Sequence, residues 1–318
     1  MILVTGGAGY IGSVCAERLL AQGYEVCVFD NLSRGFRDAI PAGAEFVEGD
    51  LEDRDVLASV FRDRPIEAVM HFAAFALVGE SMQRPNLYFR KNFVNALNLI
   101  EATVEAGVDR FVFSSTCAVF GDQVKPPISE DMPKAPVNPY GESKLAVEKA
   151  LEWSRKIHGL NYFALRYFNA CGATEERGER HEPETHLIPL VLRAAAGLSD
   201  GIHILGDDYP TPDGTCIRDY VHVLDLADAH ILALTAPADK SGCYNLGVGR
   251  GDSVREVIDA VRHATGKNFP VIIDPRRPGD PPELVAASDK IRQELSWEPK
   301  HDIHSAVRSA WNFFQKQR

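Results

Sequence analysis

Tyr140 and Lys144 are the residues whose types and spacing best suit acid–base chemistry. They stand four apart in the segment PYGESK, where Pro139 marks the expected start of a helix. Residues at positions i and i+4 share one helix face. Free tyrosine has a pKa near ~10 and is a poor base, but a neighbouring ammonium favours its phenolate form. Tyr140 is therefore predicted as a general base assisted by Lys144.

The same spacing also occurs in ordinary amphipathic helices with a surface lysine. The residues around the pair must therefore decide between a catalytic pair and an ordinary helix surface. Ser114, Ser115 and Thr116 stand at the carboxyl end of a predicted strand. Ligands of open parallel sheets bind at these strand ends. A hydroxyl at this place can bridge a substrate oxygen and Tyr140. By the same rule, the glycine-rich loop, Thr116 and Tyr140 all point to one crevice.

Three glycines indicate a phosphate-binding turn near the amino terminus. Gly6, Gly9 and Gly12 follow the first predicted strand directly and open the first predicted helix, with the spacing GxxGxxG. Glycine lets the backbone turn sharply and approach a pyrophosphate, and the helix N-terminus offers free N–H groups. A glycine pattern alone can be a plain tight turn, but the strand–glycine–helix context favours dinucleotide binding.

Asp30 favours NAD over NADP. It ends the second predicted strand, about 20 residues after the glycines, where a carboxylate holds the ribose 2′-hydroxyl. A carboxylate also repels a 2′-phosphate. Arg34 follows in the next loop and keeps the opposite choice open. We favour Asp30 because it stands at the strand end.

The elements that must position these residues alternate between strand and helix. Strand patterns cover residues 1–5, 25–30, 45–47, 68–72, 110–115 and 162–166, and amphipathic helix patterns cover 11–22, 56–64, 92–106 and 142–156. Strands and helices at this spacing form a parallel sheet covered on both faces. The predicted fold class is α/β, with a Rossmann-type doubly wound parallel sheet that binds NAD over residues 1–170.

The pattern changes in the second half of the chain. Residues 172–186 are polar and have no apolar period, which fits a loop beside a binding cleft or a solvated connection. Helix patterns follow at 187–196, 224–234, 254–265 and 303–315, with a short strand at 203–205. We predict a smaller α+β substrate-binding domain over residues 171–318. The part near 217–234 is expected to pack back on the first domain.

Composition narrows the class of protein. The chain has 318 residues, 45% hydrophobic and 25% charged, and a formal net charge of −11, which argues against a nucleic-acid surface. The six cysteines form no CxxC pair and have no zinc-like spacing with histidine, so we expect reduced thiols and no metal. The sequence begins without a signal-peptide pattern and has no apolar run of membrane-spanning length. We therefore expect a cytoplasmic protein that does not bind membranes.

The motifs together resemble the extended short-chain dehydrogenase/reductase family. TGGAGYIGS, DNLSRG, EGDL, HFAA, SSTCAVFGD, NPYGESK and RYFNACGA occur in family order. Three later segments, at residues 78–81, 205–230 and 244–251, resemble the members that act on nucleotide sugars at C4′. The resemblance implies NAD-dependent 4-epimerisation of a UDP-hexose, UDP-glucose or UDP-galactose, by transient oxidation at C4′ and hydride return to the opposite face.

Other substrates and reactions stay open at this point. UDP-N-acetylhexosamines, UDP-pentoses or another NAD-dependent oxidation of a nucleotide sugar are the alternatives. Dehydratases of the family carry Asp-Glu directly after the catalytic threonine, whereas this chain has Cys117 and Ala118. The resemblance also implies a homodimer that pairs through helices at about residues 87–106 and 142–155.

The resemblance implies that Thr116, Tyr140 and Lys144 are the catalytic set, with threonine where many members have serine.

The resemblance assigns the cofactor contacts position by position. Tyr10 and Ile11 match residues on the pyrophosphate, Asp30 and Asn31 the adenosine ribose, and Asp50 and Leu51 the adenine edge. The full set of implied NAD contacts is Gly6, Gly9, Tyr10, Ile11, Gly12, Asp30, Asn31, Asp50, Leu51, Phe72, Ala73, Asn92, Tyr140, Lys144 and Phe168.

The resemblance likewise assigns the contacts of the UDP-sugar. Phe168 and Asn169 match residues between nicotinamide and sugar, Arg218 and Arg277 match diphosphate donors, and Asp280 matches a residue on the uridine side. The full set of implied substrate contacts is Thr116, Asn169, His186, Arg218, Arg277, Asp280 and Leu284. The planar fork of arginine suits bidentate pairing with phosphate oxygens.

Three positions depart from the family pattern. Ala76 stands where many epimerases carry a lysine, so that a cofactor-phosphate contact is missing or supplied elsewhere. His186 replaces an asparagine of some members near the substrate. Leu284 stands where a bulky tyrosine is frequent, which leaves room beside the sugar C2 position. We therefore expect N-acetylated substrates to be accepted as well.

Overall fold

A computed structural model of the chain describes residues 1–122, 124–277 and 279–317. Its central element is a seven-stranded parallel sheet in the order β11-β6-β5-β4-β1-β2-β3. The strands are β1 (Ile2–Thr5), β2 (Val26–Asp30), β3 (Glu45–Glu48), β4 (Ala68–His71), β5 (Arg110–Thr116), β6 (Asn161–Tyr167) and β11 (Gly242–Leu246). The predicted α/β fold class is confirmed, and the six strands predicted for the first half all form.

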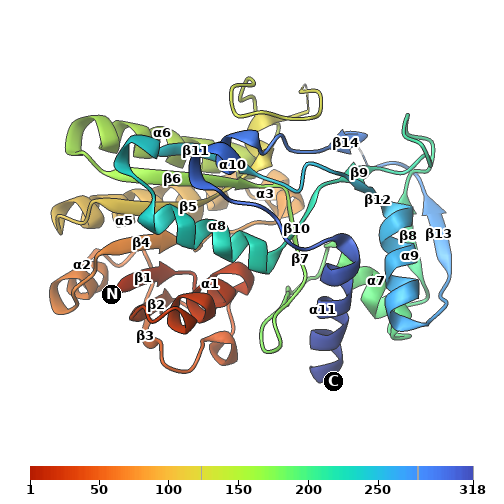
Figure 1. Cartoon of the computed structure of the whole chain (residues 1–318), viewed down its shortest axis with the longest axis horizontal. Coiled ribbons are helices and arrows are strands. Elements are labelled where there is room, and N and C mark those ends of the chain that lie inside the picture. The colour runs from red at the N-terminus through yellow and green to blue at the C-terminus, as the bar shows by residue number, and fades with distance from the viewer. Residues whose placement is uncertain (123, 278, 318) are drawn as a thin grey trace.

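Helices cover both faces of this sheet, as a doubly wound fold requires (Figure 1). They are α1 (Tyr10–Ala21), α2 (Arg54–Asp63), α3 (Val78–Gln83), α4 (Pro85–Tyr88), α5 (Asn95–Glu105), α6 (Pro139–His158) and α8 (Val223–Thr235). The short helical turns are η1 (Arg37–Ala39), η3 (Cys117–Phe120) and η4 (Ala238–Lys240), and η2 (Phe89–Val94) is π-helical. The helix predicted over 92–106 thus belongs to a longer helical run that begins at Pro85.

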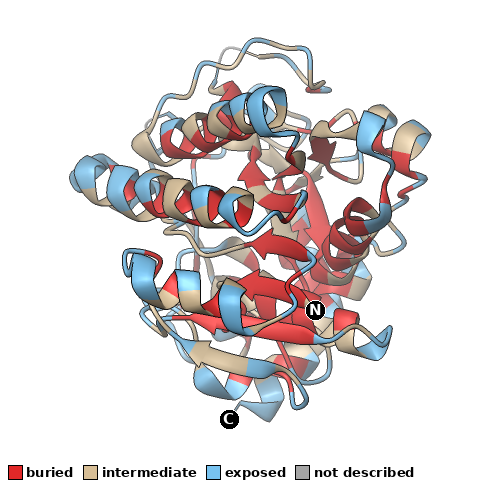
Figure 2. Cartoon of the chain, turned by 90° about the vertical axis from the view of Figure 1, so that its left-hand side faces the viewer, coloured by how far each residue is buried: buried red, intermediate tan, exposed pale blue. Residues whose placement is uncertain are grey.

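Alternation along the strands divides the core into two layers. Val4, Val28 and Met70 pack on the side of α1 and α8, whereas the adjacent residues Leu3 and Phe29 pack on the other side. Both layers are apolar because a central parallel strand is buried on both faces. Figure 2 shows these buried strands in red between helices whose outer faces are exposed.

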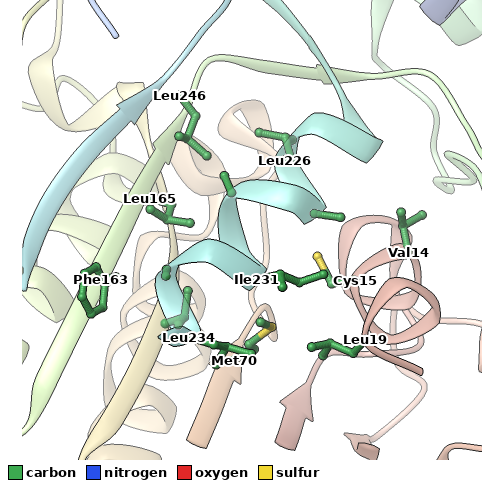
Figure 3. Close-up of a cluster of buried hydrophobic side chains, with 14 of the residues drawn as sticks. Val14, Cys15, Leu19, Met70, Phe163, Leu165, Leu226, Ile231, Leu234 and Leu246 are labelled. Carbon is green, nitrogen blue, oxygen red and sulfur yellow. The ribbon is translucent and has the colours of Figure 1, made fainter. Parts of the chain in front are cut away.

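Helix α8 returns to the first sheet from the second half of the chain. Ile231 of α8 faces Cys15 of α1, and Leu234 lies beside Met70 of β4 (Figure 3). The edge strand β11 also comes from the second half and pairs with β6. The division at residue 170 stays a prediction, and both α8 and β11, which follow that residue, belong to the large sheet and its cover.

The remaining elements form a smaller body beside the carboxyl ends of the large sheet (Figure 1). Its strands are β7 (Asn169–Cys171), β8 (Ile202–Leu205), β9 (Ile217–Arg218), β10 (Tyr220–His222), β12 (Asp252–Ser253), β13 (Val271–Asp274) and β14 (Glu283–Leu284). Its helices are α7 (Leu187–Ala195), α9 (Val254–Thr265) and α11 (Ile303–Lys316), whereas α10 (Asp289–Leu295) packs beside β11 into the core of the large sheet. The pairs β7–β10 and β8–β13 are parallel, and β9 lies between β12 and β14. Helices α7, α9 and α11 share a core of their own.

The polar segment 172–186 is held against the first half of the chain. The Arg177 Nε donates to the Ala39 carbonyl oxygen (2.9 Å), and the Arg180 guanidinium pairs with the Asp38 carboxylate (2.7 Å). The segment therefore has defined contacts along η1. Among the described residues, no helix has the length and apolarity that a membrane crossing needs.

Candidate active site

The glycine turn lies between β1 and α1, where the strand order reverses at the centre of the sheet. Gly6 has φ +74°, and a Cβ there would lie 2.4 Å from the Ala73 nitrogen. A Cβ on Gly12 would lie 2.3 Å from the Gly6 carbonyl oxygen. These two glycines are thus required by the packing of the chain itself.

Gly9 is different, because little of the protein occupies the space of its missing side chain. A Cβ there would meet only the Gly6 carbonyl oxygen, at 3.3 Å. Gly9 is the N-cap of α1 and gives no side-chain cap, and the first turn holds no acidic residue. The helix end therefore presents N–H groups and its positive pole to this open space, which fits a pyrophosphate. Tyr10 and Ile11 begin the helix directly beside it.

Asp30, which is assigned to the cofactor ribose, also holds the backbone of the glycine turn. Its carboxylate accepts hydrogen bonds from the Ala8 nitrogen (3.0 Å) and the Leu32 nitrogen (2.8 Å). Burial raises the pKa of this carboxyl, and the two backbone donors partly offset that effect. Arg34 does not approach Asp30 in this arrangement: its guanidinium bonds Glu80 (3.0 Å) and covers the Phe75 ring.

The residues assigned to the adenosine end are brought together. The Asn31 side chain donates to the Asp50 carboxylate (2.7 Å) at the ends of β2 and β3. Lys91, which the sequence analysis does not single out, also reaches Asp50 (3.3 Å). Leu51 is 4% exposed and packs into the core, so only its backbone is free to face a ligand.

The loop after β4 carries the next set of assigned cofactor contacts. The Phe72 and Ala73 nitrogens both donate to the Thr5 carbonyl oxygen (2.8 and 3.1 Å), which places them beside the glycine turn. The Asn92 amide bonds the backbone of Phe75 (2.8 and 2.9 Å) and the Ser143 hydroxyl (3.1 Å). Asn92 therefore fixes this loop to α6, and direct contact with the cofactor stays a prediction.

Thr116, Tyr140 and Lys144 meet at the end of β5. Asn138 caps α6 by accepting from the Gly141 nitrogen (2.8 Å), so the helix begins at Pro139 as the sequence predicts. The Lys144 Nζ donates to the Ser114 carbonyl oxygen (2.7 Å). Burial lowers the pKa of Lys144 to about 7. Burial raises the pKa of Tyr140 to about 12, and an interaction with the Thr116 hydroxyl works in the opposite direction.

A buried ion pair lies one helical turn behind Lys144. The Glu148 carboxylate pairs with the Arg166 guanidinium through two contacts (2.9 and 2.8 Å) and accepts from the Ser115 hydroxyl (2.6 Å). Both charged side chains are 4% exposed. The sequence analysis misses these residues, although the spacing of four between Lys144 and Glu148 on one helix face is a usable signal.

The residues assigned to the diphosphate and uridine converge around one carboxylate. Asp280 pairs with Arg277 (2.8 and 3.0 Å) and lies 3.7 Å from the Arg218 guanidinium. Leu284 of β14 stands opposite Arg218 of β9 in the strand pairing. Four of the predicted substrate residues thus gather in one region, where the Arg218 and Arg277 guanidinium groups both lie near the Asp280 carboxylate.

The sugar end of this region is apolar. Phe168 belongs to a small cluster with Phe120 and Ala286, and Leu284 and Cys117 pack against that cluster. Asn169 begins β7, and its amide donates to the Asp219 carbonyl oxygen (3.1 Å). Leu284 and Cys117, the residue that follows Thr116 at the end of β5, therefore pack against the same apolar cluster.

Asp219 is a second residue that the sequence analysis misses. Its carboxylate accepts from the backbone nitrogens of Val248 (2.7 Å), Gly249 (3.0 Å) and Ala286 (3.2 Å). Burial raises its pKa to about 6 even though these three donors oppose the shift. It ties the loop after β11 to the segment after β14. The adjacent RD pair in CIRDYVH is the only sequence signal for it.

His186 contacts carboxylates of its own loop. Its Nδ1 lies 2.8 Å from Glu179 Oε1 and 2.9 Å from Glu184 Oε1. Burial lowers the pKa of His186, but the hydrogen bonds with these two carboxylates outweigh burial and raise the pKa to about 10. Its assigned contact with the substrate stays a prediction.

Known proteins share this sequence and this fold. Residues 2–247 match the model of the NAD dependent epimerase/dehydratase family. The UDP-glucose 4-epimerase of Lacticaseibacillus casei is 48% identical, covering 99% of this chain and 96% of its own. A crystal structure of a UDP-glucose 4-epimerase has a TM-score of 0.96 at 49% identity, covering 99% of this chain and 98% of that one. The structure of UDP-glucose 4-epimerase from Brucella ovis in complex with NAD has a TM-score of 0.95 at 44% identity, covering 98% of each chain.

The two kinds of glycine can be separated by substitution. We expect Gly12→Ala to lower the free energy of unfolding by about 1–3 kcal/mol, because the added carbon overlaps the Gly6 carbonyl. Gly9→Ala should keep most of the stability and bind NAD at least about tenfold more weakly. Urea unfolding and NAD content after gel filtration measure the two effects. Gly79→Ala, where nothing lies within 4 Å of the added carbon, is the control. Equal loss of NAD and stability in both test variants would contradict this assignment.

Proposed function

The chain belongs to the NAD dependent epimerase/dehydratase family, and on that premise we propose that it interconverts UDP-glucose and UDP-galactose by inverting C4′. The observation that carries the proposal is the meeting of Thr116, Tyr140 and Lys144 at the end of β5. NAD as cofactor fits the open space at Gly9, the free end of α1 and the carboxylate of Asp30. The residues named above for cofactor and substrate are proposed as its contacts.

The chain's own groups supply proton transfer and orientation. When bound, NAD provides a hydride acceptor and a positive charge beside the phenol. Tyr140 accepts the proton of the 4′-hydroxyl, and Thr116 orients that oxygen through its own hydroxyl. Lys144 holds its ammonium near the phenol and stabilises the phenolate. After the sugar has turned about its link to the diphosphate, Tyr140 returns the proton on the opposite face.

The residues after Thr116 support epimerisation over elimination of water. A dehydratase needs an acid and a base there, and Ala118 has neither. Burial raises the pKa of the Cys117 thiol to about 12, so this side chain stays protonated near neutral pH. Proton transfer in this crevice therefore rests on Tyr140.

Leu284 supports a wider range of sugars. It packs against the apolar cluster around Phe168, as Cys117 does. A tyrosine ring at this position would take up more of the space than the leucine side chain. We propose that UDP-N-acetylhexosamines are also substrates. UDP-pentoses lack the C6′ group and remain the second candidate class.

A homodimer is proposed from the outer faces of two helical runs. On α6, Trp153 is 61% exposed and Ile157 is 67% exposed, and they stand four apart on one face. On η2, which packs against α6, Phe89 and Val94 are also exposed. Large apolar side chains gathered on neighbouring helices are typical of subunit interfaces.

The six free thiols also favour a reducing compartment, and we propose the cytoplasm.

Incubation with UDP-sugars but without added cofactor tests the reaction. UDP-glucose and UDP-galactose should each give a mixture of the two 4-epimers by chromatography, with no net NADH by absorbance. Tyr140→Phe should keep its bound NAD and lose about 10²–10⁴-fold in turnover, because the proton acceptor is gone. Accumulation of NADH in step with product would contradict epimerisation, and full activity of the variant would contradict the role of Tyr140.

The sugar pocket is tested at Leu284. The native chain should turn over UDP-N-acetylgalactosamine as well as UDP-galactose. Leu284→Tyr should reduce kcat/KM for the N-acetylated sugar about tenfold or more relative to UDP-galactose, because the ring fills space beside C2. Leu284→Met preserves volume and should leave the ratio of the two kcat/KM values unchanged. No turnover of UDP-N-acetylgalactosamine by the native chain would reject this proposal.

Light scattering after size-exclusion chromatography tests the dimer. The native chain should elute at twice its 35.0 kDa mass, and a Trp153→Glu, Ile157→Lys double variant should elute as a monomer. Ile273→Lys changes an exposed apolar residue of β13, far from α6 in the sequence, and should remain dimeric. A double variant that keeps the native mass at every protein concentration would place the interface elsewhere.

A further inference from the structure

The polar segment before α7 gathers four metal-ligating side chains that the proposed reaction does not use as acids or bases. The members are Glu179, His181, Glu184 and His186, and we call them the His/Glu cluster. One ligand atom from each lies within 4.8 Å of the others. The sequence predicts no metal, because its cysteines have no zinc-like spacing, but cysteine patterns do not report on a site of this composition.

The ligand atoms of the His/Glu cluster lie close to one another. His186 Nδ1 lies 2.8 Å from Glu179 Oε1 and 2.9 Å from Glu184 Oε1. His181 Nδ1 lies 3.3 Å from the same Glu179 oxygen and 4.0 Å from the other Glu184 oxygen, Oε2. Both carboxylate side chains are 10% exposed. Two imidazole nitrogens and two carboxylates thus face one another with little water around the acids.

Hydrogen bonding alone does not satisfy this arrangement. His181 Nδ1 is buried and makes no hydrogen bond of good geometry with the described residues, although Glu179 Oε1 lies 3.3 Å from it. His186 Nδ1 carries at most one proton, yet it faces two carboxylates at nearly equal distance. Buried polar atoms without partners are rare, and a bound ion is one of their established explanations.

A zinc ion accounts for the observed spacing. Zn²⁺ binds histidine nitrogen and carboxylate oxygen at about 2.0–2.2 Å in a tetrahedron, so its ligand atoms lie roughly 3.3–3.6 Å apart. Of the four histidine–glutamate distances, 2.8 and 2.9 Å lie below that range, 3.3 Å lies at its lower edge, and 4.0 Å lies above it. Imidazole nitrogens disfavour Mg²⁺ and Ca²⁺, which take oxygen ligands, and favour zinc and its transition-metal neighbours.

We propose that the His/Glu cluster binds one Zn²⁺ per chain as a structural site. Four protein ligands fill a tetrahedral zinc and leave no position for a substrate, which distinguishes a structural from a catalytic zinc. The ion would close the segment from residue 179 to residue 186, and His186 is also the residue that begins α7 as its N-cap.

The position of the cluster gives the ion a role beside the cofactor. Tyr10, the first residue of α1, donates to the Gly172 carbonyl oxygen (2.6 Å) at the start of the same segment. Burial raises the pKa of Tyr10, and the charges of Glu179 and Glu184 add to that shift, so the cluster lies close to this side chain. With Arg177 and Arg180 bound to η1, a zinc clip would hold the segment against the NAD-binding turn.

Zinc content and affinity test the proposal on the full-length chain. The protein is stripped with a chelator, titrated with Zn²⁺ against a chromophoric competitor, and analysed by mass spectrometry of the metal. The native chain should bind one zinc per chain. His181→Gln and Glu179→Gln should bind it more than about tenfold more weakly, because even outer-shell changes reach that size. His181→Gln keeps the test informative if Glu179→Gln, at a more buried position, does not fold.

Two control variants make the same Glu→Gln and His→Gln changes outside the His/Glu cluster. Glu182→Gln lies in the same segment outside the cluster, and His203→Gln removes a histidine that pairs with Asp274 elsewhere. Both should keep one zinc. Zinc should also raise the melting temperature of the native chain and of the controls, but not of the cluster variants. No zinc uptake by the native chain, or equal uptake by His181→Gln, would overturn the proposal, as would equal uptake of Ca²⁺.

Discussion

A titratable nitrogen buried beneath the strand ends organises the candidate site. Lys144 is 3% exposed, and burial lowers its pKa from 10.5 to about 7, which at about 1.4 kcal/mol per unit is a cost of several kcal/mol. The chain offsets part of this cost with the Ser114 carbonyl, the face of the Phe113 ring and the carboxylate of Glu148. The Ser114 carbonyl takes one of the three N–H donors of this ammonium, and the others can serve a phenolate.

The Glu148–Arg166 pair explains why β5, β6 and α6 must pack in one arrangement. Arg166 comes from β6, Glu148 from α6, and the Ser115 hydroxyl that completes the carboxylate comes from β5. A buried charge left without its partner costs about 3–5 kcal/mol, so displacement of any of these elements is strongly disfavoured. The same packing fixes Thr116, which follows Ser115, relative to Tyr140. Stability and catalytic geometry therefore depend on shared contacts.

The sequence predicted the features that have a local pattern. Short apolar runs between helical patterns located six strands of the large sheet, and the spacing of Tyr140 and Lys144 indicated their shared face. The seventh strand, β11, was missed because its pairing with β6 joins residues far apart, such as Tyr244 and Leu165, without a local signal. The Asp219 carboxylate and the His/Glu cluster were missed for a related reason. Their partners come from turns, whose geometry hydrophobic periodicity does not encode.

The two halves of the site differ in how far protein contacts bury and fix their side chains before a ligand binds. On the cofactor side, Asp30 and Asn92 are 8% and 2% exposed, and backbone groups fix them before any ligand binds. On the substrate side, the Arg277 side chain is 61% exposed, and its guanidinium is occupied by Asp280. In the proposed complex, a diphosphate would compete with that carboxylate for the arginine. An enzyme that oxidises and reduces the same sugar in one visit needs this asymmetry, because the cofactor has to stay while the product leaves.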